Sequence, residues 1–204
     1  MPLPIVFRSG SGNLTFNVDY YDYATGAGYK KFYLAGAGDS VGNKYFLTTD
    51  SGLNSDTQNY MAGTGSDIDF DLTFNNPTVI AGAEATISFM TLCSGNDGDT
   101  FSVAVTVYHV AVGGAETSIG TVTITDADGD PARKMKRTAK LTLTSKALAI
   151  GEKLRINLVI TAAGTGAATW KVYFDPAGTI SHTAESGGTI NSSASINIPF
   201  KIDL

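Results

Sequence analysis

The sequence predicts an all-β protein built as a two-sheet antiparallel sandwich, and three observations support this prediction. Apolar residues recur at every second position in most segments, which is the period of a half-buried strand. No segment shows the apolar period of a helix. Turn-forming residues interrupt the chain every eight to fifteen positions, which leaves eight or nine strands after residue 44. Strands of this kind bury their apolar faces by packing one sheet against another.

The clearest strands lie between Gly151 and Pro176. Residues 154–160 place a row of aliphatic side chains on one face, and Trp170 is in phase with the two apolar residues that follow it. A Gly/Thr-rich loop at 164–166 separates these segments. We therefore expect the two strands to pair as a hairpin, with Trp170 packed in the core rather than stacked on a sugar.

Residues 1–35 predict an extended N-terminal arm, and residues 36–204 predict the sandwich domain. Pro2 and Pro4 remove backbone donors near the start of the arm. Five of the nine tyrosines also fall in this segment: Tyr20, Tyr21, Tyr23, Tyr29 and Tyr33. These side chains either contact a partner, or cap one end of the sandwich within the same subunit.

The strands of the sandwich begin at Lys44. The segment 66–74 alternates apolar residues with Asp67, Asp69 and Asp71, so it reads as a half-buried strand whose aspartates face solvent or a partner. Residues 85–93 are apolar on both faces, which predicts a central strand. Cys93 is the only cysteine, so no intrachain disulfide can form.

Two shifts in apolar phase predict β-bulges, because a bulge inserts one extra residue into a strand. The first follows His109, and the second lies near Gly120, where Ile119 is out of phase with Val122. A long loop is expected over residues 177–193. Pro199 interrupts the last strand, which predicts a sheet edge or a partner on the proline-free side.

The composition argues against several classes of function. The formal net charge is −5 and the sequence pI is near 4.9, which disfavours nucleic-acid packing because that role needs a broad positive surface. The N-terminus lacks the features of a secretory signal, and no run approaches the roughly 20 apolar residues of a membrane span. We therefore expect a protein made in the cytoplasm, without nucleic acid or membrane as partners.

Three aspartates in one turn form a candidate calcium site. Asp126, Asp128 and Asp130 supply the hard oxygen ligands that Ca²⁺ prefers. The EF-hand pattern fails, because Pro131 and Arg137 stand where that loop needs glycine and glutamate. A weakly bound structural Ca²⁺ is the one cofactor that these residues suggest.

A basic row follows the acidic turn. Five of the 14 basic residues lie within eight positions: Arg133, Lys134, Lys136, Arg137 and Lys140. Two interpretations stay open. The row is either a solvated strand edge that discourages unwanted pairing, or a salt-dependent contact with an acidic neighbour such as the Asp67 row of an adjacent copy.

The sequence shows no catalytic pattern. His109 and His182 are the only histidines, and neither is accompanied by a Ser/His/Asp order or a His/Cys cluster. The expectation from the sequence is therefore a protein without enzymatic activity.

Five segments carry a family resemblance: KYFLTT at 44–49, TSIGTVTIT at 117–125, the basic approach to LTLT at 141–144, GEKLRINLVITA at 151–162 and WKVYFDP at 170–176. Together they resemble the jelly-roll domains of virion proteins from tailed bacteriophages. The pattern covers roughly residues 44–204, and it is similar also to jelly rolls of bacterial surface proteins and carbohydrate-binding modules. The resemblance implies a jelly roll that cements a capsid or decorates a tail, often as a trimer.

The resulting expectation is a non-enzymatic structural protein on the outside of a phage-like virion. Its partners would be further copies of itself, as a homotrimer, and capsid or tail subunits. The expected contact residues are Tyr20, Tyr21, Tyr23, Tyr29, Arg133, Lys134, Lys136 and Arg137. A carbohydrate-binding or receptor-binding β-sandwich module is the alternative.

Overall fold

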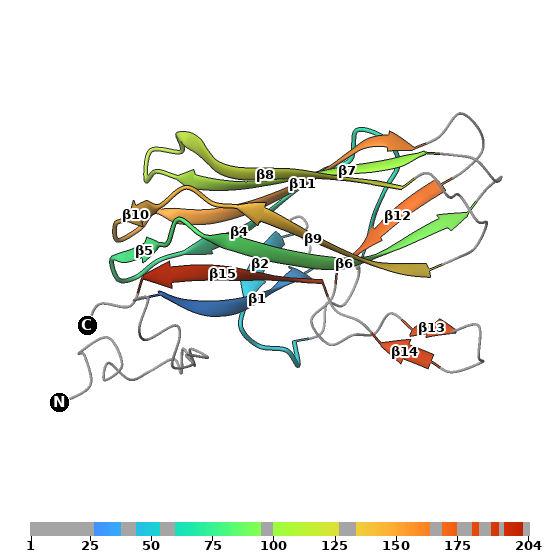
Figure 1. The fold of residues 1–204 in the computed structure, drawn as a ribbon, viewed down its shortest axis with the longest axis horizontal. Coiled ribbons are helices and arrows are strands. Elements are labelled where there is room, and N and C mark those ends of the chain that lie inside the picture. The colour runs from blue at the N-terminus through green and yellow to red at the C-terminus, as the bar shows by residue number, and fades with distance from the viewer. Residues whose placement is uncertain are drawn as a thin grey trace.

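The structure, a computed structural model, describes residues 27–37, 44–53, 60–94, 100–126, 134–163, 169–174, 181–183, 189–191 and 194–201. These residues form strands and turns and contain no helix (Figure 1). The longer strands are β1 (Ala27–Ala37), β2 (Lys44–Thr48), β4 (Asp67–Thr73), β6 (Glu84–Ser94), β7 (Phe101–Val110), β8 (Glu116–Asp126), β9 (Lys134–Thr142), β11 (Lys153–Ala163), β12 (Thr169–Tyr173) and β15 (Ser195–Lys201). The prediction of an all-β protein is confirmed.

Five further strands have only three residues each: β3 (Tyr60–Ala62), β5 (Thr78–Ile80), β10 (Lys146–Leu148), β13 (Ser181–Thr183) and β14 (Thr189–Asn191). The sequence pattern did not predict them, because three residues are too few to show an alternation. β13 and β14 pair with each other within the segment that was expected to be a loop.

The other strands form one 13-stranded mixed sheet. Its main path runs β3-β12-β6-β15-β1-β2-β4-β11-β7-β8, β9 pairs with β6, and β5 pairs with β10 and β15. The pair β2 and β4 is parallel, and the remaining pairs are antiparallel. The backbone ladders therefore show one large mixed sheet where two antiparallel sheets were predicted.

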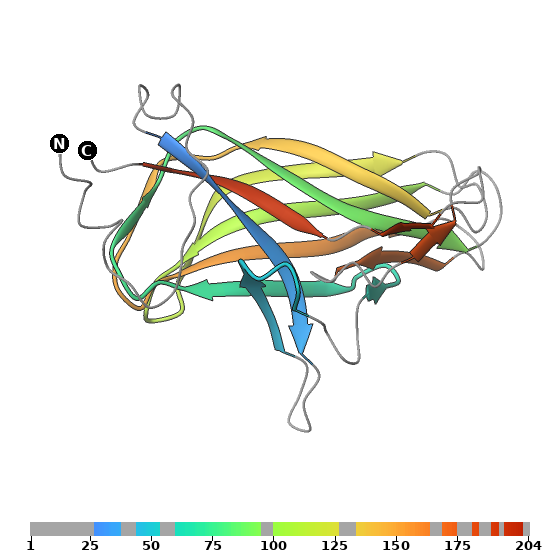
Figure 2. The same ribbon diagram turned by 90° about the horizontal axis from the view of Figure 1, so that it is seen from below.

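β1 joins the two halves of this sheet. One half holds β3, β5, β6, β9, β10, β12 and β15, and the other holds β2, β4, β7, β8 and β11. Its N-terminal part pairs with β15, from Ala27 opposite Lys201 to Tyr33 opposite Ser195, and its C-terminal part pairs with β2. Figure 2 shows β1 crossing diagonally between these two partners. The predicted boundary at residue 35 falls inside β1. Residues 1–26 lie outside the described residues, so the arm itself stays a prediction.

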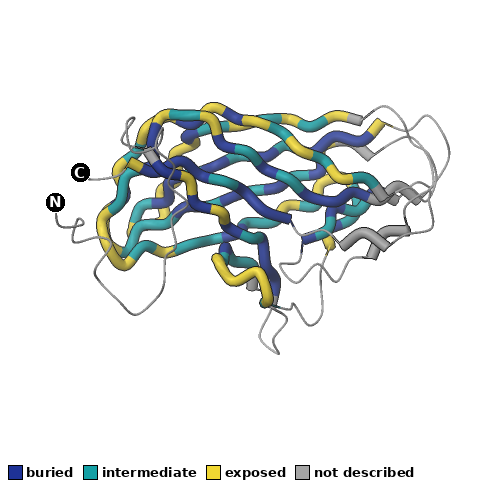
Figure 3. The backbone as a smooth tube through the Cα atoms, turned by 60° about the horizontal axis from the view of Figure 1, so that its bottom comes forward, coloured by how far each residue is buried: buried dark blue, intermediate teal, exposed yellow. Residues whose placement is uncertain are grey.

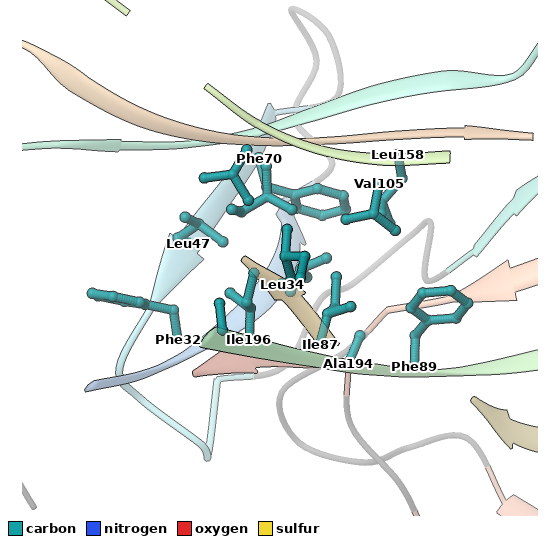
Figure 4. Close-up of a cluster of buried hydrophobic side chains, with 14 of the residues drawn as sticks. Phe32, Leu34, Leu47, Phe70, Ile87, Phe89, Val105, Leu158, Ala194 and Ile196 are labelled. Carbon is teal, nitrogen blue, oxygen red and sulfur yellow. The ribbon is translucent and has the colours of Figure 1, made fainter. Parts of the chain in front are cut away.

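The core lies between the two halves of the sheet. Buried residues alternate with more exposed ones along most strands (Figure 3), and the aliphatic row at 154–160 is fully buried, as predicted. Trp170 is 2% exposed and stacks on Phe101 with ring centroids 4.5 Å apart. Figure 4 shows side chains from both halves converging, with the labels Phe32, Leu34, Leu47, Phe70, Ile87, Phe89, Val105, Leu158, Ala194 and Ile196.

The predicted hairpin between β11 and β12 is wrong. β11 pairs with β4 and β7, whereas β12 pairs with β6 and β3. The apolar faces of both strands were predicted correctly, but the chain between them leads from one half of the sheet to the other. Each strand contributes its apolar row to the same core from opposite sides.

One predicted bulge is present and the other is not. The β7–β8 ladder shifts register between Val107 opposite Gly120 and Tyr108 opposite Ser118, which leaves Ile119 as the extra residue. No shift in this ladder follows His109. β7 ends at Val110, and the phase change there comes from a turn in which Ala111 N donates to Ala115 O at 2.9 Å.

β15 is not an edge strand, since it lies between β1 and β6. Its ladder with β6 ends at Asn197, two residues before Pro199. The carbonyl of Pro199 accepts a hydrogen bond from Ala81 N at 2.9 Å. The missing N–H of proline therefore falls where the β6 ladder has already stopped.

Candidate functional site

A network of charged side chains covers the outer face of β4 and β11. Arg155 on β11 donates hydrogen bonds to both carboxylate oxygens of Asp71 on β4, at 2.7 and 2.9 Å. Arg155 also contacts Asp69 at 2.8 Å and Glu116 of β8 at 2.5 Å. Lys153 adds a hydrogen bond to Asp71 at 3.1 Å. One guanidinium thus holds three carboxylates from two strands.

The network sets the protonation of its members. Burial raises the pKa of Asp71, but hydrogen bonds and charge from Arg155 and Lys153 outweigh burial and hold that pKa below its usual value. The hydrogen bonds to Asp71 in turn raise the pKa of Arg155. These shifts keep both groups charged over the range in which most proteins work.

Asn157 extends the network along β11. Its amide nitrogen donates to Asp67 and, at 2.8 Å, to Asp69. The aspartate row therefore faces the polar side chains of β11, and only Asp67 is exposed. Among the described residues, no group of three or more His, Cys, Asp or Glu side chains is arranged to hold a metal ion.

The sequence pointed to the aspartate row but not to Arg155. The period of β11 places Arg155 on the polar face, but the period does not identify the neighbouring strand. Only the register that sets Arg155 opposite Asp71 on one side and Tyr108 on the other reveals the network.

His109 forms a second polar centre at one end of the sheet. Its side chain is 8% exposed, and Nε2 lies 2.9 Å from Oε2 of Glu152. The same carboxylate accepts a hydrogen bond from Ala149 N at 2.8 Å. This bond, together with the contact to His109, lowers the pKa of Glu152.

Among the described residues, no nucleophile accompanies this pair. No described hydroxyl or thiol hydrogen-bonds to His109, and its Nδ1 is buried without a partner in the described part of the chain. A hydrolase of the triad type needs a nucleophile within hydrogen-bond reach of the histidine. The side chain of His182 lies outside the described residues.

The predicted contact residues fall in different places. Tyr29 lies on β1 and is 39% exposed, whereas Tyr20, Tyr21, Tyr23 and Arg133 lie outside the described residues. Lys136 is exposed on β9, and Arg137 points the other way, toward Thr91 of β6. Lys134 is in β9, but its side chain is not among those described. The structure therefore does not bring these residues into one described site, and their role stays a prediction.

The predicted calcium turn is also untested. Asp126 is the last residue of β8, its side chain is not described, and Asp128 and Asp130 lie outside the described residues. No helix in the described ranges is long and apolar enough to span a membrane.

Two tyrosines and a lysine meet on β3 and β12. The rings of Tyr60 and Tyr173 lie 5.7 Å apart, and Nζ of Lys171 lies 4.3 Å from the centre of the Tyr60 ring. Tyr60 is 38% exposed. Burial, followed by the neighbouring Tyr60, raises the pKa of Tyr173. The alternation in the sequence does not reveal this cluster, because Tyr60 belongs to one of the three-residue strands.

No protein-family model and no curated protein matches this chain. Solved structures do share its fold. A CocE/NonD family hydrolase from Staphylococcus aureus aligns with a TM-score of 0.57 and 12% identity, over 86% of this chain and 37% of the hydrolase. An aminopeptidase from a marine sediment Thaumarchaeota archaeon gives 0.58 and 10%, over 86% and 37%. An α-amino acid ester hydrolase gives 0.52 and 11%, over 83% and 36%.

These comparisons correct the functional prediction. The solved structures named above are hydrolytic enzymes, and they contradict the prediction of a non-enzymatic protein that decorates the capsid of a bacteriophage. Identities of 10–12% establish a shared fold alone, and this chain spans 36–37% of the enzymes' length. The functional prediction rested on a strand and turn pattern, and such patterns recur in proteins of unrelated function. The resemblance to virion proteins and the location in a virion are not tested by these comparisons and stay predictions.

Proposed function

We propose that this chain forms the β-sheet domain of a hydrolytic enzyme that acts on esters or on amino-terminal peptide bonds. The observation that carries the proposal is the fold shared with a CocE/NonD family hydrolase, an aminopeptidase and an α-amino acid ester hydrolase over 83–86% of this chain. About two thirds of each enzyme has no counterpart in this match. In our proposal that remainder corresponds to the part of the enzyme that supplies the nucleophile.

The Arg155 network supports a role in docking onto such a catalytic part. Interfaces between domains are more polar than obligate interfaces. Arg155 is already fixed by Asp69, Asp71 and Glu116, so little side-chain entropy is lost when a partner contacts it. The charged surface on β4 and β11 therefore suits a contact that orients one domain on another.

The proposal is tested by assaying the protein as isolated from its natural source with an antibody against this chain. The substrates are an α-amino acid methyl ester and an aminoacyl p-nitroanilide. We expect hydrolysis of at least one of them to purify in constant ratio with the chain. A homogeneous preparation that hydrolyses neither substrate would show that the shared fold carries no hydrolytic role here.

A matched pair of variants, expressed in the source organism, separates docking from chemistry. Replacing Arg155 with Gln removes the positive charge at the centre of the network. We expect the catalytic part, and with it the hydrolytic activity, to separate from this variant as the salt concentration is raised. Replacing Lys201, the last residue of β15, with Gln changes the net charge by the same amount. The hydrolytic activity should still purify with this variant at high salt. Equal behaviour of the two variants would exclude the β4–β11 face as the contact.

We also infer that the sheet closes on itself as a jelly-roll sandwich. The support is a hydrogen bond of 2.7 Å from Thr144 N, just after β9, to the carbonyl of Ile119 on β8. This bond links strands that are not neighbours in the ladder order. Amide hydrogen exchange tests the inference: Thr144 should be protected to the level of the core strands, whereas the exposed amide of Gly113 should exchange rapidly. Fast exchange at both positions would indicate an open sheet.

A further inference from the structure

One face of the sheet gathers lysines although the chain is acidic. β9, β6, β15 and β1 are successive neighbours and lie one below another in Figure 1. Lys31 on β1 is opposite Asn197, Asn197 is opposite Thr86, and Thr86 is opposite Lys140 on β9. Residues in register share one side of a sheet, so the two lysines bound a row about 14 Å long across three strand spacings.

We call this surface the lysine face and define it by its exposed cations, Lys31, Lys136, Lys140 and Lys201. In the described parts of these four strands, Glu84 is the one acidic residue whose side chain faces outward. Its Oε1 lies 2.7 Å from Nζ of Lys140. No other ion pair joins the four lysines within the described part of the chain. The face is therefore positive in a protein of net charge −5.

A second row extends the lysine face to the tyrosine cluster. Lys136 on β9 is opposite Met90 of β6, Met90 is opposite Tyr173 of β12, and Tyr173 is opposite Tyr60 of β3. Lys171 is the neighbour of Tyr60 on this side. Met90 itself is buried, with 2% of its surface exposed, so only Lys136, Lys171 and the two tyrosines of this row contribute to the surface of the face.

Apart from the buried Met90 and Pro199, the side chains between the lysines are polar and uncharged. Thr86, Ser88, Thr138 and Asn197 fill the central strip. The large hydrophobic side chains exposed on the described surface are Tyr29, Tyr60, Val112 and Ile150. The two aliphatic ones lie in turns, so the lysine face exposes tyrosine rings but no aliphatic patch.

We propose that the lysine face binds an acidic polysaccharide, with its carboxylates at the lysines and its sugar rings against Tyr29 and Tyr60. Hydroxyl and amide side chains match the hydroxyl groups of sugars, and amphipathic tyrosines provide a ring surface with a polar end. A protein partner is a poorer fit, because the buried centre of a protein interface is apolar. This binding site is separate from the hydrolytic role proposed above and does not depend on it.

A nucleic acid is also a poorer fit. Its charge density favours proteins with a broad basic surface, whereas the lysine face has a few cations spread over several strands in an acidic chain. A polysaccharide that alternates carboxylates with uncharged groups has the lower charge density that this spacing suits.

The test uses the full chain and two forms of one polymer, polygalacturonate and fully methyl-esterified polygalacturonate. Binding is measured by calorimetry and by affinity electrophoresis at low and high salt. We expect binding to the acidic form that weakens as salt is raised, and no binding to the esterified form. Absence of binding to polygalacturonate at low salt would overturn the proposal, as would equal binding of the two forms.

Variants locate the site. Replacing Lys31, Lys136 or Lys140 singly with Gln should weaken binding about two- to fivefold each, the range of exposed ion contacts. Replacing Lys153 with Gln changes the net charge equally on the opposite face and is the matched control. Replacing Tyr60 with Leu should weaken binding without changing its salt dependence. Loss of binding in the Lys153 variant equal to that of the others would place the site elsewhere.

Two further measurements exclude other occupants. Single-stranded DNA that binds as tightly as polygalacturonate would overturn the polysaccharide in favour of a general polyanion site. A rise in solution mass by light scattering that the Lys31 and Lys140 variants abolish would assign the face to contacts between copies of this chain. We expect neither result.

Discussion

Arg155 of β11 and Asp71 of β4 face each other in register and are joined by two parallel hydrogen bonds, at 2.7 and 2.9 Å. Two-point pairing of a guanidinium with a carboxylate is the strongest geometry available to these groups. Lys153 approaches the same carboxylate from the adjacent position. The pair therefore fixes both the charge and the register of two neighbouring strands.

Replacing Asp71 with Asn should lower the free energy of unfolding by about 1–3 kcal/mol at neutral pH, because the charge-assisted hydrogen bonds are lost. The pKa of Asp71 lies below its usual value of 3.8, so its contribution is complete above that value and disappears as the pH falls through the lowered pKa. Urea unfolding at neutral and acidic pH measures this. Asp67→Asn is the control, with a smaller loss expected at its exposed position.

Lys30 should make stability depend on alkaline pH. It is 4% exposed, and burial lowers its pKa from 10.5 to about 8. Between these values the unfolded chain holds a proton that the folded chain releases, so this group makes stability rise with pH in that window. Replacing Lys30 with Met should remove the rise, as measured by urea unfolding. Lys31→Met, on the exposed side of the same strand, should retain it.

Gly120 should tolerate no larger residue. A Cβ atom at this position would lie 2.7 Å from Cδ2 of Leu143 and 2.8 Å from the carbonyl oxygen of Thr142. Gly120→Ala should therefore cost about 1–3 kcal/mol of stability by overpacking, measured by thermal or urea unfolding. Adding Leu143→Ala should not rescue it, because the backbone carbonyl remains. Gly113→Ala, where nothing lies within 4 Å, should be close to neutral.

Trp170 should report on the buried core. It is the only tryptophan, and its ring is buried against Phe101. We expect the maximum of its fluorescence emission to lie at a shorter wavelength than that of tryptophan in water. Iodide should quench this fluorescence only weakly until the chain unfolds. Phe101→Leu should weaken the shift. Iodide quenching of the native protein as strong as that of the unfolded chain would contradict the placement of β12 over the core.

The faces of the strands were predictable and their partners were not. The alternation at 154–160 identified the buried side of β11, because the period of a strand depends only on its own sequence. The same argument cannot say which strand lies beside it. The glycines at 164 and 166 favoured a hairpin, yet β11 and β12 join different halves of the sheet, since burial of both apolar rows against each other outweighs the local turn.

The candidate sites show the same limit. The aspartates of β4 were visible as an alternating row, but Arg155, their partner, lies over 80 positions away and becomes visible only through register. The lysines that define the lysine face come from three strands, β1, β9 and β15, so the sequence displayed only the β9 lysines and Tyr29. The buried His109 was expected at a bulge. Its contact with Glu152 depends on a turn between β10 and β11 that no local sequence pattern predicted.

The pairing of β1 with β15 has a consequence for biosynthesis. β1 can pair with β2 as soon as both have left the ribosome, but its other edge waits until β15 (Ser195–Lys201) has been translated. Contacts this distant in sequence make folding slow, and an unpaired strand edge invites association with other chains while it remains open. Half of β1 therefore stays unprotected while β2 to β14 are being made, and the emergence of β15 closes that edge.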